Sequence, residues 1–212
     1  MHLTTLLFDL DGTLIDSAAD LGYALNRLRA DLRLAPLSMA TIISNIGDGA
    51  RLLVQRSLPE SLYGEACLRQ FLDYYSEHLV EDTVVYPGIL DCLTAWQNRP
   101  MAIVTNKPYA LTMEILRRLD LLPFFPVVIG GDSTETKKPD PLPVVQALNQ
   151  LGQPAETALM IGDHVNDLLA GQAAGTRTCF CSWGLGQHRN ARRDYQVADP
   201  RELFALLTAE LK

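Results

Sequence analysis

The sequence predicts an α/β fold in which a mainly parallel sheet carries an inserted α-helical subdomain. Three observations support this prediction. Short runs that are apolar on both faces alternate with longer helical patterns over most of the chain. One long stretch near the N-terminus shows helical periodicity only. The length of 212 residues corresponds to about 1.4 domains of ~150 residues, which fits one core domain with a smaller insertion.

Five short apolar runs are typical of parallel strands that helices cover on both sides. They comprise residues 3–10, 101–105, 127–130, 158–162 and 178–182. Their alternation with helical patterns indicates βα units and therefore a mainly parallel sheet.

Helical patterns follow or separate these runs at residues 88–97, 108–119, 143–151, 165–174 and 201–211. Gly175 is placed to end the fourth of these helices. Asp199, Pro200 and Glu202 form the pattern of an N-cap, a proline at the first helical position and a capping-box partner. We therefore expect a final helix from Arg201 onward.

Residues 17–82 show no convincing strand. Apolar residues recur there at helical spacing, as in Leu21, Leu25 and Leu28. The segment is far longer than one crossover connection between parallel strands needs. We therefore predict a helical subdomain at residues 17–82, inserted into a core made of residues 1–16 and 83–212.

The charge balance argues against some classes of partner. The chain has 18 basic and 25 acidic residues, so its net charge is −7. An acidic protein is a poor candidate for a nucleic-acid coat or a polybasic membrane binder, so we expect neither partner. The same charge should repel an anionic substrate unless a local feature reverses the field.

The sequence also predicts a cytoplasmic protein. The N-terminal residues contain no basic region followed by a small-residue cleavage site, and no apolar stretch is long enough to span a membrane. The four cysteines, Cys67, Cys92, Cys179 and Cys181, lack the spacing of a zinc site. They are best interpreted as reduced thiols in the core of a cytosolic protein. The oligomeric state is left open.

The first candidate site is FDLDGT at residues 8–13, where the first predicted strand ends. Side chains two apart in an extended chain share one side, so Asp9 and Asp11 can converge outside the strand ends. An aspartate can attack phosphorus as a nucleophile, and a second can serve as general acid and base. Gly12 lets the chain leave the strand sharply. The alternative is an ordinary turn with two solvated aspartates.

The second candidate site is GDHVND at residues 162–167, after the fourth strand. Asp163 and Asp167 are four residues apart and share one face of a helix that begins there. Aspartates also favour helix N-termini as caps, which is the alternative interpretation. Together with Asp9 they offer the oxygen ligands that Mg²⁺ prefers.

Two further groups lie at predicted strand ends or in the loop beyond. Thr105 and Asn106 offer a hydroxyl and exposed amides that suit a phosphate oxygen, or they cap the next helix. Lys138 stands in the proline-rich loop KKPDP after the third strand and could neutralise a phosphoryl group in transfer. A solvated loop lysine is the alternative. The ordered placement of all these groups after successive strands favours a shared site.

At this point the sequence resembles a known family. FDLDGT, VTN, KKP and GDHVND are similar to the four motifs of the haloacid dehalogenase superfamily of phosphatases, and the inserted helical segment matches its cap. The resemblance covers nearly the whole chain. It implies a Rossmann-like core, dependence on Mg²⁺ and a phospho-aspartyl intermediate. The dehalogenase branch of that family is disfavoured, since it lacks a counterpart of Asp11 and uses no Mg²⁺.

The resemblance also implies roles for individual residues. Asp9 matches the nucleophile, and Asp11 matches the acid and base. Thr105 matches the hydroxyl that binds phosphate. Lys138 matches the motif lysine better than Lys137 does.

The same resemblance implies the metal ligands. Asp163 matches a metal ligand, with Asp167 as a second ligand or a partner behind it. The carbonyl oxygen of Asp11 usually completes such a metal site, beside the Asp9 carboxylate.

Within the phosphatases, local strings at residues 46–58, 85–89 and 104–108 resemble bacterial phosphoglycolate phosphatases. The expected substrate is thus a small phosphorylated metabolite, first of all 2-phosphoglycolate. A phosphatase for a sugar phosphate, nucleotide or pyrophosphate is an alternative. A phosphotransferase such as a sugar phosphomutase is another.

The cap contains a candidate for recognition of the substrate carboxylate. Two glycines, Gly47 and Gly49, stand beside Arg51 in the string NIGDGAR. Exposed amides there, with the guanidinium, could hold a small carboxylate. A turn between two helices with a surface arginine is the equally weighted alternative.

Overall fold

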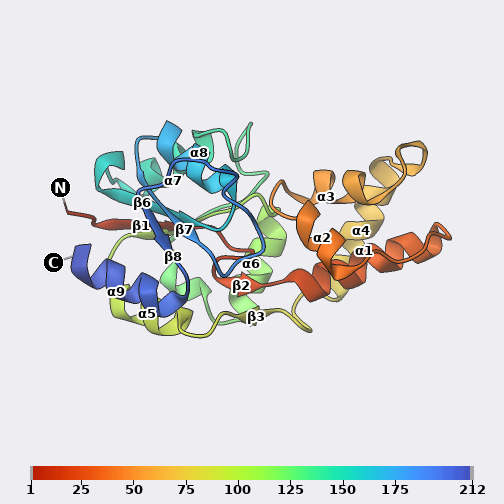
Figure 1. Ribbon diagram of the computed structural model, residues 1–212, viewed down its shortest axis with the longest axis horizontal. Coiled ribbons are helices and arrows are strands. Elements are labelled where there is room, and N and C mark those ends of the chain that lie inside the picture. Colours follow the sequence, from red (N-terminus) through yellow and green to blue (C-terminus); the bar gives the residue numbers. More distant parts are fainter. Residues whose placement is uncertain (1, 211–212) are drawn as a thin grey trace.

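The protein, described by a computed structural model over residues 2–210, contains a six-stranded sheet (Figure 1). The strand order is β5-β4-β1-β6-β7-β8, and every neighbouring pair is parallel. The strands are β1 (Thr5–Phe8), β4 (Met101–Val104), β5 (Val127–Ile129), β6 (Ala158–Gly162), β7 (Arg177–Cys181) and β8 (Tyr195–Val197). No helix in residues 2–210 combines the length and apolar character needed to cross a membrane.

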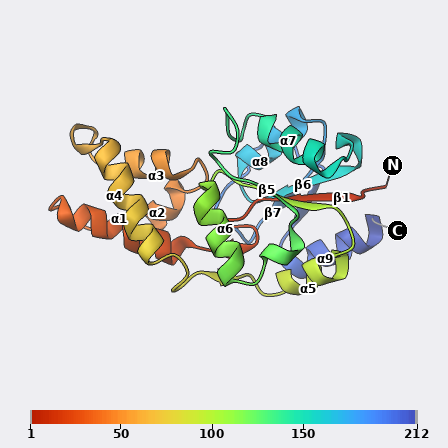
Figure 2. The same ribbon diagram turned by 180° about the vertical axis from the view of Figure 1, so that it is seen from behind.

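Helices cover both faces of this sheet, because its strands present apolar side chains on both. In β1, Leu7 packs in one apolar cluster with Val144 of α7, while Leu6 and Phe8 pack in the other. One face carries α7 (Leu142–Leu151) and α8 (Val165–Ala173). The other carries α5 (Ile89–Trp96), α6 (Tyr109–Arg118) and α9 (Pro200–Glu210) (Figures 1 and 2). The predicted α/β class with a mainly parallel sheet is therefore confirmed.

The predicted core strands and helices are all present, with ends shifted by a few residues. The strand expected at 178–182 begins at Arg177, and Gly175 follows the end of α8 with a φ of +85°. The predicted end of the last helix at Leu211 lies outside the described residues. The sequence did not predict β8, because three residues in a polar stretch carry too little periodicity to indicate a strand. Short 3₁₀ helices occur at Glu60–Leu62, Leu122–Phe124 and Ala155–Thr157.

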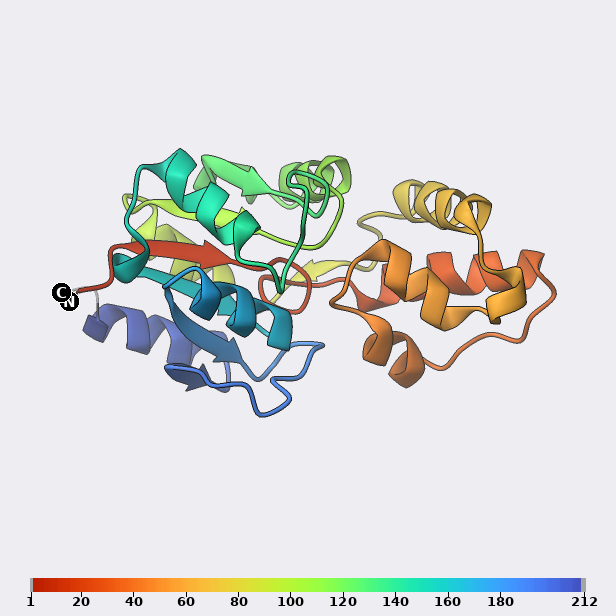
Figure 3. The same cartoon turned by 90° about the horizontal axis from the view of Figure 1, so that it is seen from above.

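Residues 17–82, which we call the cap, contain α1 (Ala18–Asp31), α2 (Met39–Asn45), α3 (Ala50–Ser57) and α4 (Glu65–Glu77). These helices pack on one another through side chains such as Leu25 of α1 and Phe71 of α4. Figure 3 shows the cap beyond the end of the sheet toward which the strands run. A short antiparallel ribbon, β2 (Ile15–Asp16) with β3 (Val84–Val85), joins the cap to the core.

A buried aspartate fixes the segment that returns from the cap to the core. The carboxylate of Asp20, on α1, is fully buried. It accepts hydrogen bonds from the backbone N–H groups of Glu81, Asp82 and Thr83, with the Thr83 bond 2.9 Å long. The Thr83 hydroxyl and His78 Nδ1 lie 2.6 and 3.1 Å from it. Burial alone would raise the pKa of Asp20, but the hydrogen bonds from Thr83 and Asp82 outweigh it and lower the pKa.

We expect Asp20→Asn to lower the free energy of unfolding by about 2–3 kcal/mol at pH 7, because the amide cannot accept these bonds as a carboxylate does. A carboxyl whose pKa is lowered by folding adds stability above its unfolded pKa of about 4 and loses it as the pH falls through the folded pKa. Urea unfolding of both proteins should therefore show a difference that disappears in acid. The exposed Asp73→Asn on α4 is the control, and a pH-independent difference would contradict the prediction.

Candidate active site

The predicted catalytic residues meet at the carboxyl ends of three adjacent strands. Asp9 follows β1, Thr105 follows β4, and Asp163 follows β6. Because β1 lies between β4 and β6, the three side chains are brought to one edge of the sheet. Lys138 reaches the same place from the loop after β5.

Lys138 lies at the centre of this cluster and is almost fully buried. Its Nζ atom donates hydrogen bonds to Asp9 Oδ1 at 2.9 Å, Asp167 Oδ1 at 2.6 Å and the Val104 carbonyl oxygen at 2.5 Å. Burial alone would lower the pKa of Lys138, but the carboxylates of Asp167 and Asp9 raise it. The lysine is therefore held as an ammonium ion in contact with the expected nucleophile.

The carboxyl groups around this lysine repel one another. Burial raises the pKa of Asp9 to about 6, against the lowering effect of Lys138, and the Asp167 charge adds to the rise. The pKa of Asp163 is also raised, first by burial and then by the charges of Asp9 and Asp167. These groups would ionise fully only with more positive charge nearby.

The cluster meets the requirements of a divalent metal site. Carboxylate oxygens of Asp9, Asp163 and Asp167 lie within 4.8 Å of one another, and all three residues are buried. With all three carboxylates ionised, the cluster and the Lys138 ammonium would together carry a charge of −2. An oxygen-rich, negatively charged set of this kind suits a hard dication. The residues predicted from the two aspartate motifs are thus brought together as a possible metal site, apart from Asp11.

A tight backbone cradle fixes Asp163. Its Oδ2 atom accepts the N–H groups of Leu185 and Gly186, each at 2.8 Å, and its Oδ1 atom accepts the Thr13 hydroxyl at 3.2 Å. Gly12 has a φ of +82°, and a Cβ there would lie 2.1 Å from Asp163 Oδ2. Only glycine lets the turn after β1 approach this carboxylate so closely.

The carboxylate of Asp11 lies outside the cluster of Asp9, Asp163 and Asp167 and pairs with a lysine that the motif analysis gave no role. Lys107 Nζ lies 2.8 and 2.9 Å from the two carboxylate oxygens of Asp11, and the Ser17 hydroxyl donates to Oδ1. The Lys107 side chain is only 4% exposed. Burial alone would lower the pKa of Lys107, but the Asp11 carboxylate raises it above its ordinary value. The expected acid and base is therefore oriented from two sides.

Thr105 and Asn106 both reach the site, with different surroundings. Thr105 is buried and lines the cavity beside Asp9. Asn106 Nδ2 donates to the carbonyl oxygens of Lys138 at 2.9 Å and Gly47 at 3.0 Å. Its Oδ1 atom is buried without a hydrogen-bond partner among the described residues. The amide group thus bridges core and cap, and only an acceptor atom is left for a ligand.

The loop between α2 and α3 docks onto the core beside these residues. In addition to the Gly47 contact, Lys137 Nζ donates to the Asp48 carbonyl oxygen at 2.6 Å. Asn166 Nδ2 donates to Asp48 Oδ1 at 2.6 Å. Gly47 has a φ of +116°, and a Cβ there would lie 2.7 Å from His164 Cδ2. The cap is therefore closed against the core at this loop.

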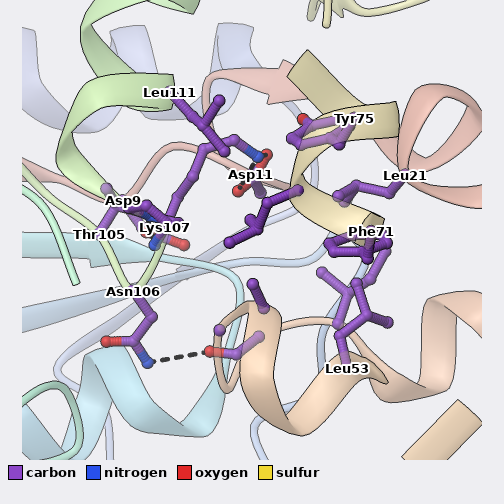
Figure 4. A pocket seen from close by; sticks show the side chains of 16 residues that line it. Asp9, Asp11, Leu21, Leu53, Phe71, Tyr75, Thr105, Asn106, Lys107 and Leu111 are labelled. Carbon is purple, nitrogen blue, oxygen red and sulfur yellow. Dashed lines mark hydrogen bonds and ion pairs between the residues drawn. The ribbon is translucent and has the colours of Figure 1, made fainter. Parts of the chain in front are cut away.

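A cavity of about 50 Å³ remains between the docked cap and the core (Figure 4). Asp9, Asp11 and Thr105 line it from the core. From the cap it is lined by the backbone around Gly47 and Gly49 and by apolar side chains, Leu21, Leu53, Phe71 and Leu72 among them. A cavity of this volume has room for only a small group.

Arg51 is not among the residues that line this cavity. It lies on the surface of the cap, where its guanidinium makes two hydrogen bonds to the carboxylate of Glu65 and one to the Tyr63 hydroxyl. Its side chain is 53% exposed. Gly47 and Gly49 reach the cavity as expected, whereas the arginine is directed elsewhere in this closed arrangement. Its role in carboxylate binding stays a prediction.

Several residues of the site escaped the sequence analysis. Lys107 directly follows the predicted Thr105-Asn106 pair, and a cation next to a phosphate motif is the signal that could have indicated it. Asp48 and Asn166 each lie within a segment already singled out, but no local pattern links residues 118 positions apart. The backbone donors at Leu185 and Gly186 have only the glycines of the string GLG as a signal.

Comparison with known proteins agrees with this geometry. Residues 6–181 match the model of the family described as haloacid dehalogenase-like hydrolase. A phosphoglycolate phosphatase of Chromobacterium violaceum is 37% identical, with 97% of each chain covered. One from Aquifex aeolicus is 36% identical, also over 97% of each chain.

A solved structure shows the same fold. The crystal structure of a predicted phosphoglycolate phosphatase from Haemophilus somnus 129pt matches with a TM-score of 0.91 at 28% identity, covering 97% of this chain and 98% of that one. The family match spans far more than half of the chain and includes all four motif segments. The chain therefore belongs to the haloacid dehalogenase-like hydrolases, the family that the sequence motifs indicated.

Proposed function

We propose that the protein is a Mg²⁺-dependent phosphomonoester hydrolase that acts through a phospho-aspartyl intermediate, with 2-phosphoglycolate as its substrate. Membership of the hydrolase family, and relatives named phosphoglycolate phosphatase, support the phosphatase activity. The observation that carries the choice of substrate is the small pocket of about 50 Å³ that Asp9 and Asp11 line from the core and the cap covers from the other side. It suits a two-carbon acid far better than a sugar or a nucleotide.

The first step is attack by Asp9 on phosphorus. Lys138 binds Asp9 Oδ1, and no described residue donates a hydrogen bond to Oδ2, which is the oxygen free to attack. As the Asp9–phosphorus bond forms, the ester P–O bond breaks. The leaving oxygen takes a proton from Asp11, which enters this step in its protonated form. The Thr105 hydroxyl can donate to a phosphoryl oxygen, and the Lys138 ammonium offsets the charge of the transferring group.

In the second step a water molecule attacks the phosphoryl group and breaks the bond to Asp9. Asp11, now ionised, takes the proton of that water, and inorganic phosphate leaves. Lys107 and Ser17 hold the Asp11 carboxylate in place for both transfers. The apolar cap side of the cavity limits the access of other water molecules.

Asp9, Asp163 and Asp167, with the carbonyl oxygen of Asp11, are the proposed Mg²⁺ ligands. The buried charge of −2 around Lys138 supports a dication there. When bound, the ion would supply positive charge to the phosphoryl oxygens and reduce their repulsion from the carboxylates. This local positive charge would offset the repulsion that a chain with a net charge of −7 exerts on an anionic substrate.

A panel of phosphate esters tests the proposal. We expect kcat/KM for 2-phosphoglycolate to exceed that for glucose 6-phosphate, a nucleoside monophosphate and pyrophosphate by at least about 10-fold, since the small pocket between cap and core fits a two-carbon leaving group best. Chelation with EDTA should abolish phosphate release, and added Mg²⁺ should restore it. Preference for a sugar phosphate, or appearance of the phosphoryl group on a sugar instead of as free phosphate, would refute the assignment.

We also propose that the enzyme works in the cytoplasm. All four cysteines are free, and Cys92, Cys179 and Cys181 are buried. Reduced core thiols are typical of a reducing compartment.

A further inference from the structure

The wall of the cavity contains one cationic side chain among the described residues. Apart from the reacting groups and the backbone of the cap loop, the cavity is lined mostly by apolar side chains. Lys107 is the exception, because Lys138 lies beneath Asp9 and does not line the cavity. Arg51 lies outside it, paired with Glu65. A substrate that carries a second negative charge can meet a positive side chain here only at Lys107.

The ammonium of Lys107 is placed between the acid and base of the core and an aromatic ring of the cap. It contacts both oxygens of Asp11 and lies 4.7 Å from the ring centroid of Tyr75 on α4. Figure 4 shows Tyr75 of the cap facing Asp11 of the core. An ammonium group has three N–H donors, so Lys107 can bind a ligand without releasing Asp11.

The Tyr75 hydroxyl supplies an independent indication of a ligand. Tyr75 is 1% exposed and lines the cavity. Lys107 interacts with its hydroxyl oxygen, but an ammonium group can only donate, and no described residue accepts the Tyr75 O–H. Burial raises the pKa of Tyr75 to about 12, although the charge of Lys107 opposes the rise, so the hydroxyl keeps its proton as a donor. Buried polar atoms without a partner are rare in proteins and call for a missing partner.

We propose that Lys107 and Tyr75 together bind the carboxylate of the substrate, and so select short phosphorylated acids. The inference rests on the proposed function, because it takes the phosphoryl group to react at Asp9. The carboxylate accepts one N–H of Lys107 and the O–H of Tyr75. Since Tyr75 belongs to the cap, the carboxylate bridges cap and core in the closed enzyme. A neutral leaving group of the same size, such as hydroxyethyl, would accept weaker hydrogen bonds there, because it lacks the negative charge of the carboxylate.

The test compares two substrates that differ only in the group bound by Lys107 and Tyr75: 2-phosphoglycolate and 2-hydroxyethyl phosphate. We expect Lys107→Met to raise KM for 2-phosphoglycolate by about 10- to 100-fold, the effect of losing a charge-assisted hydrogen bond. KM for 2-hydroxyethyl phosphate should change by less than about 3-fold. Loss of support for Asp11 should lower kcat for both substrates by the same factor. Arg118→Met removes one exposed cation from α6 and is the matched control.

A second variant keeps the proposal open to refutation if Lys107→Met fails to fold. Tyr75→Phe retains the ring and should raise KM for 2-phosphoglycolate alone, by about 3- to 10-fold. Equal changes of KM for both substrates in either variant would overturn the proposal and leave Lys107 as a positioning residue for Asp11. A selective effect of Arg51→Ala without one of Lys107→Met would place the carboxylate at the arginine instead.

Failure of the proposed function would look different. In that case the unmodified enzyme would not prefer 2-phosphoglycolate over 2-hydroxyethyl phosphate. If the unmodified enzyme shows the preference and Lys107→Met keeps it, only the assignment of Lys107 fails.

Discussion

Asp9→Asn is expected to reduce Mg²⁺-dependent phosphate release by at least about 10⁴-fold, with the folded structure intact. The amide cannot attack phosphorus, whereas its Oδ1 atom can still accept the hydrogen bond from Lys138 that the carboxylate accepts at 2.9 Å. Release of inorganic phosphate measures the activity, and circular dichroism with thermal unfolding checks the fold.

Asp91→Asn serves as the control for this variant, because Asp91 is an exposed carboxylate on α5. It should leave phosphate release unchanged. If Asp9→Asn retained more than a few per cent of the activity, the nucleophile would have to be another residue, and the proposed mechanism would be wrong from its first step.

Lys138→Met should destabilise the protein by about 3–5 kcal/mol when no metal is bound, and should also abolish activity. The substitution removes the ammonium that contacts Asp9 and Asp167 and leaves both carboxylates buried without a cation. Methionine fills similar space, so the loss is chiefly electrostatic. Urea unfolding in the presence of EDTA measures the change in the free energy of unfolding.

A double-mutant cycle gives this second prediction its control. Adding Asp167→Asn to Lys138→Met removes one of the two buried carboxylate charges that have lost their cation. The double variant should therefore recover part of the lost stability. Asp167→Asn alone should destabilise, because it weakens the bonds to Lys138 and to the His164 N–H at the start of α8. Additive losses would show that the charges around the lysine are not coupled.

The sequence predicted the core well because its signals are local. Each strand of the sheet's centre is a short apolar run, and Asp9, Thr105 and Asp163 each follow such a run directly. Parallel pairing then brings them together without further information. β8 was missed because its three residues, only one of them buried, carry no such signal.

The cap side of the site could not be predicted in the same way. Arg51 on α3 can point toward the cavity or toward Glu65 on α4. The choice depends on how α3 is rotated against α4, and no spacing in the sequence determines that rotation. Likewise, the contact of Lys107 with Tyr75 depends on how the cap sits on the core. Helical periodicity shows which face of a helix is buried, but it does not show which neighbour covers that face.

The docked loop at residues 47–49 has a consequence for how such an enzyme can change its specificity. Asn106 and Lys137 bind the carbonyl oxygens of Gly47 and Asp48, atoms that every amino acid possesses. Ile46 and Ala50 flank this loop and line the cavity, yet neither side chain makes those bonds. New side chains at these two positions can reshape the space around a leaving group without removing the hydrogen bonds that hold the cap loop on the core. Substrate range and cap closure can therefore evolve separately.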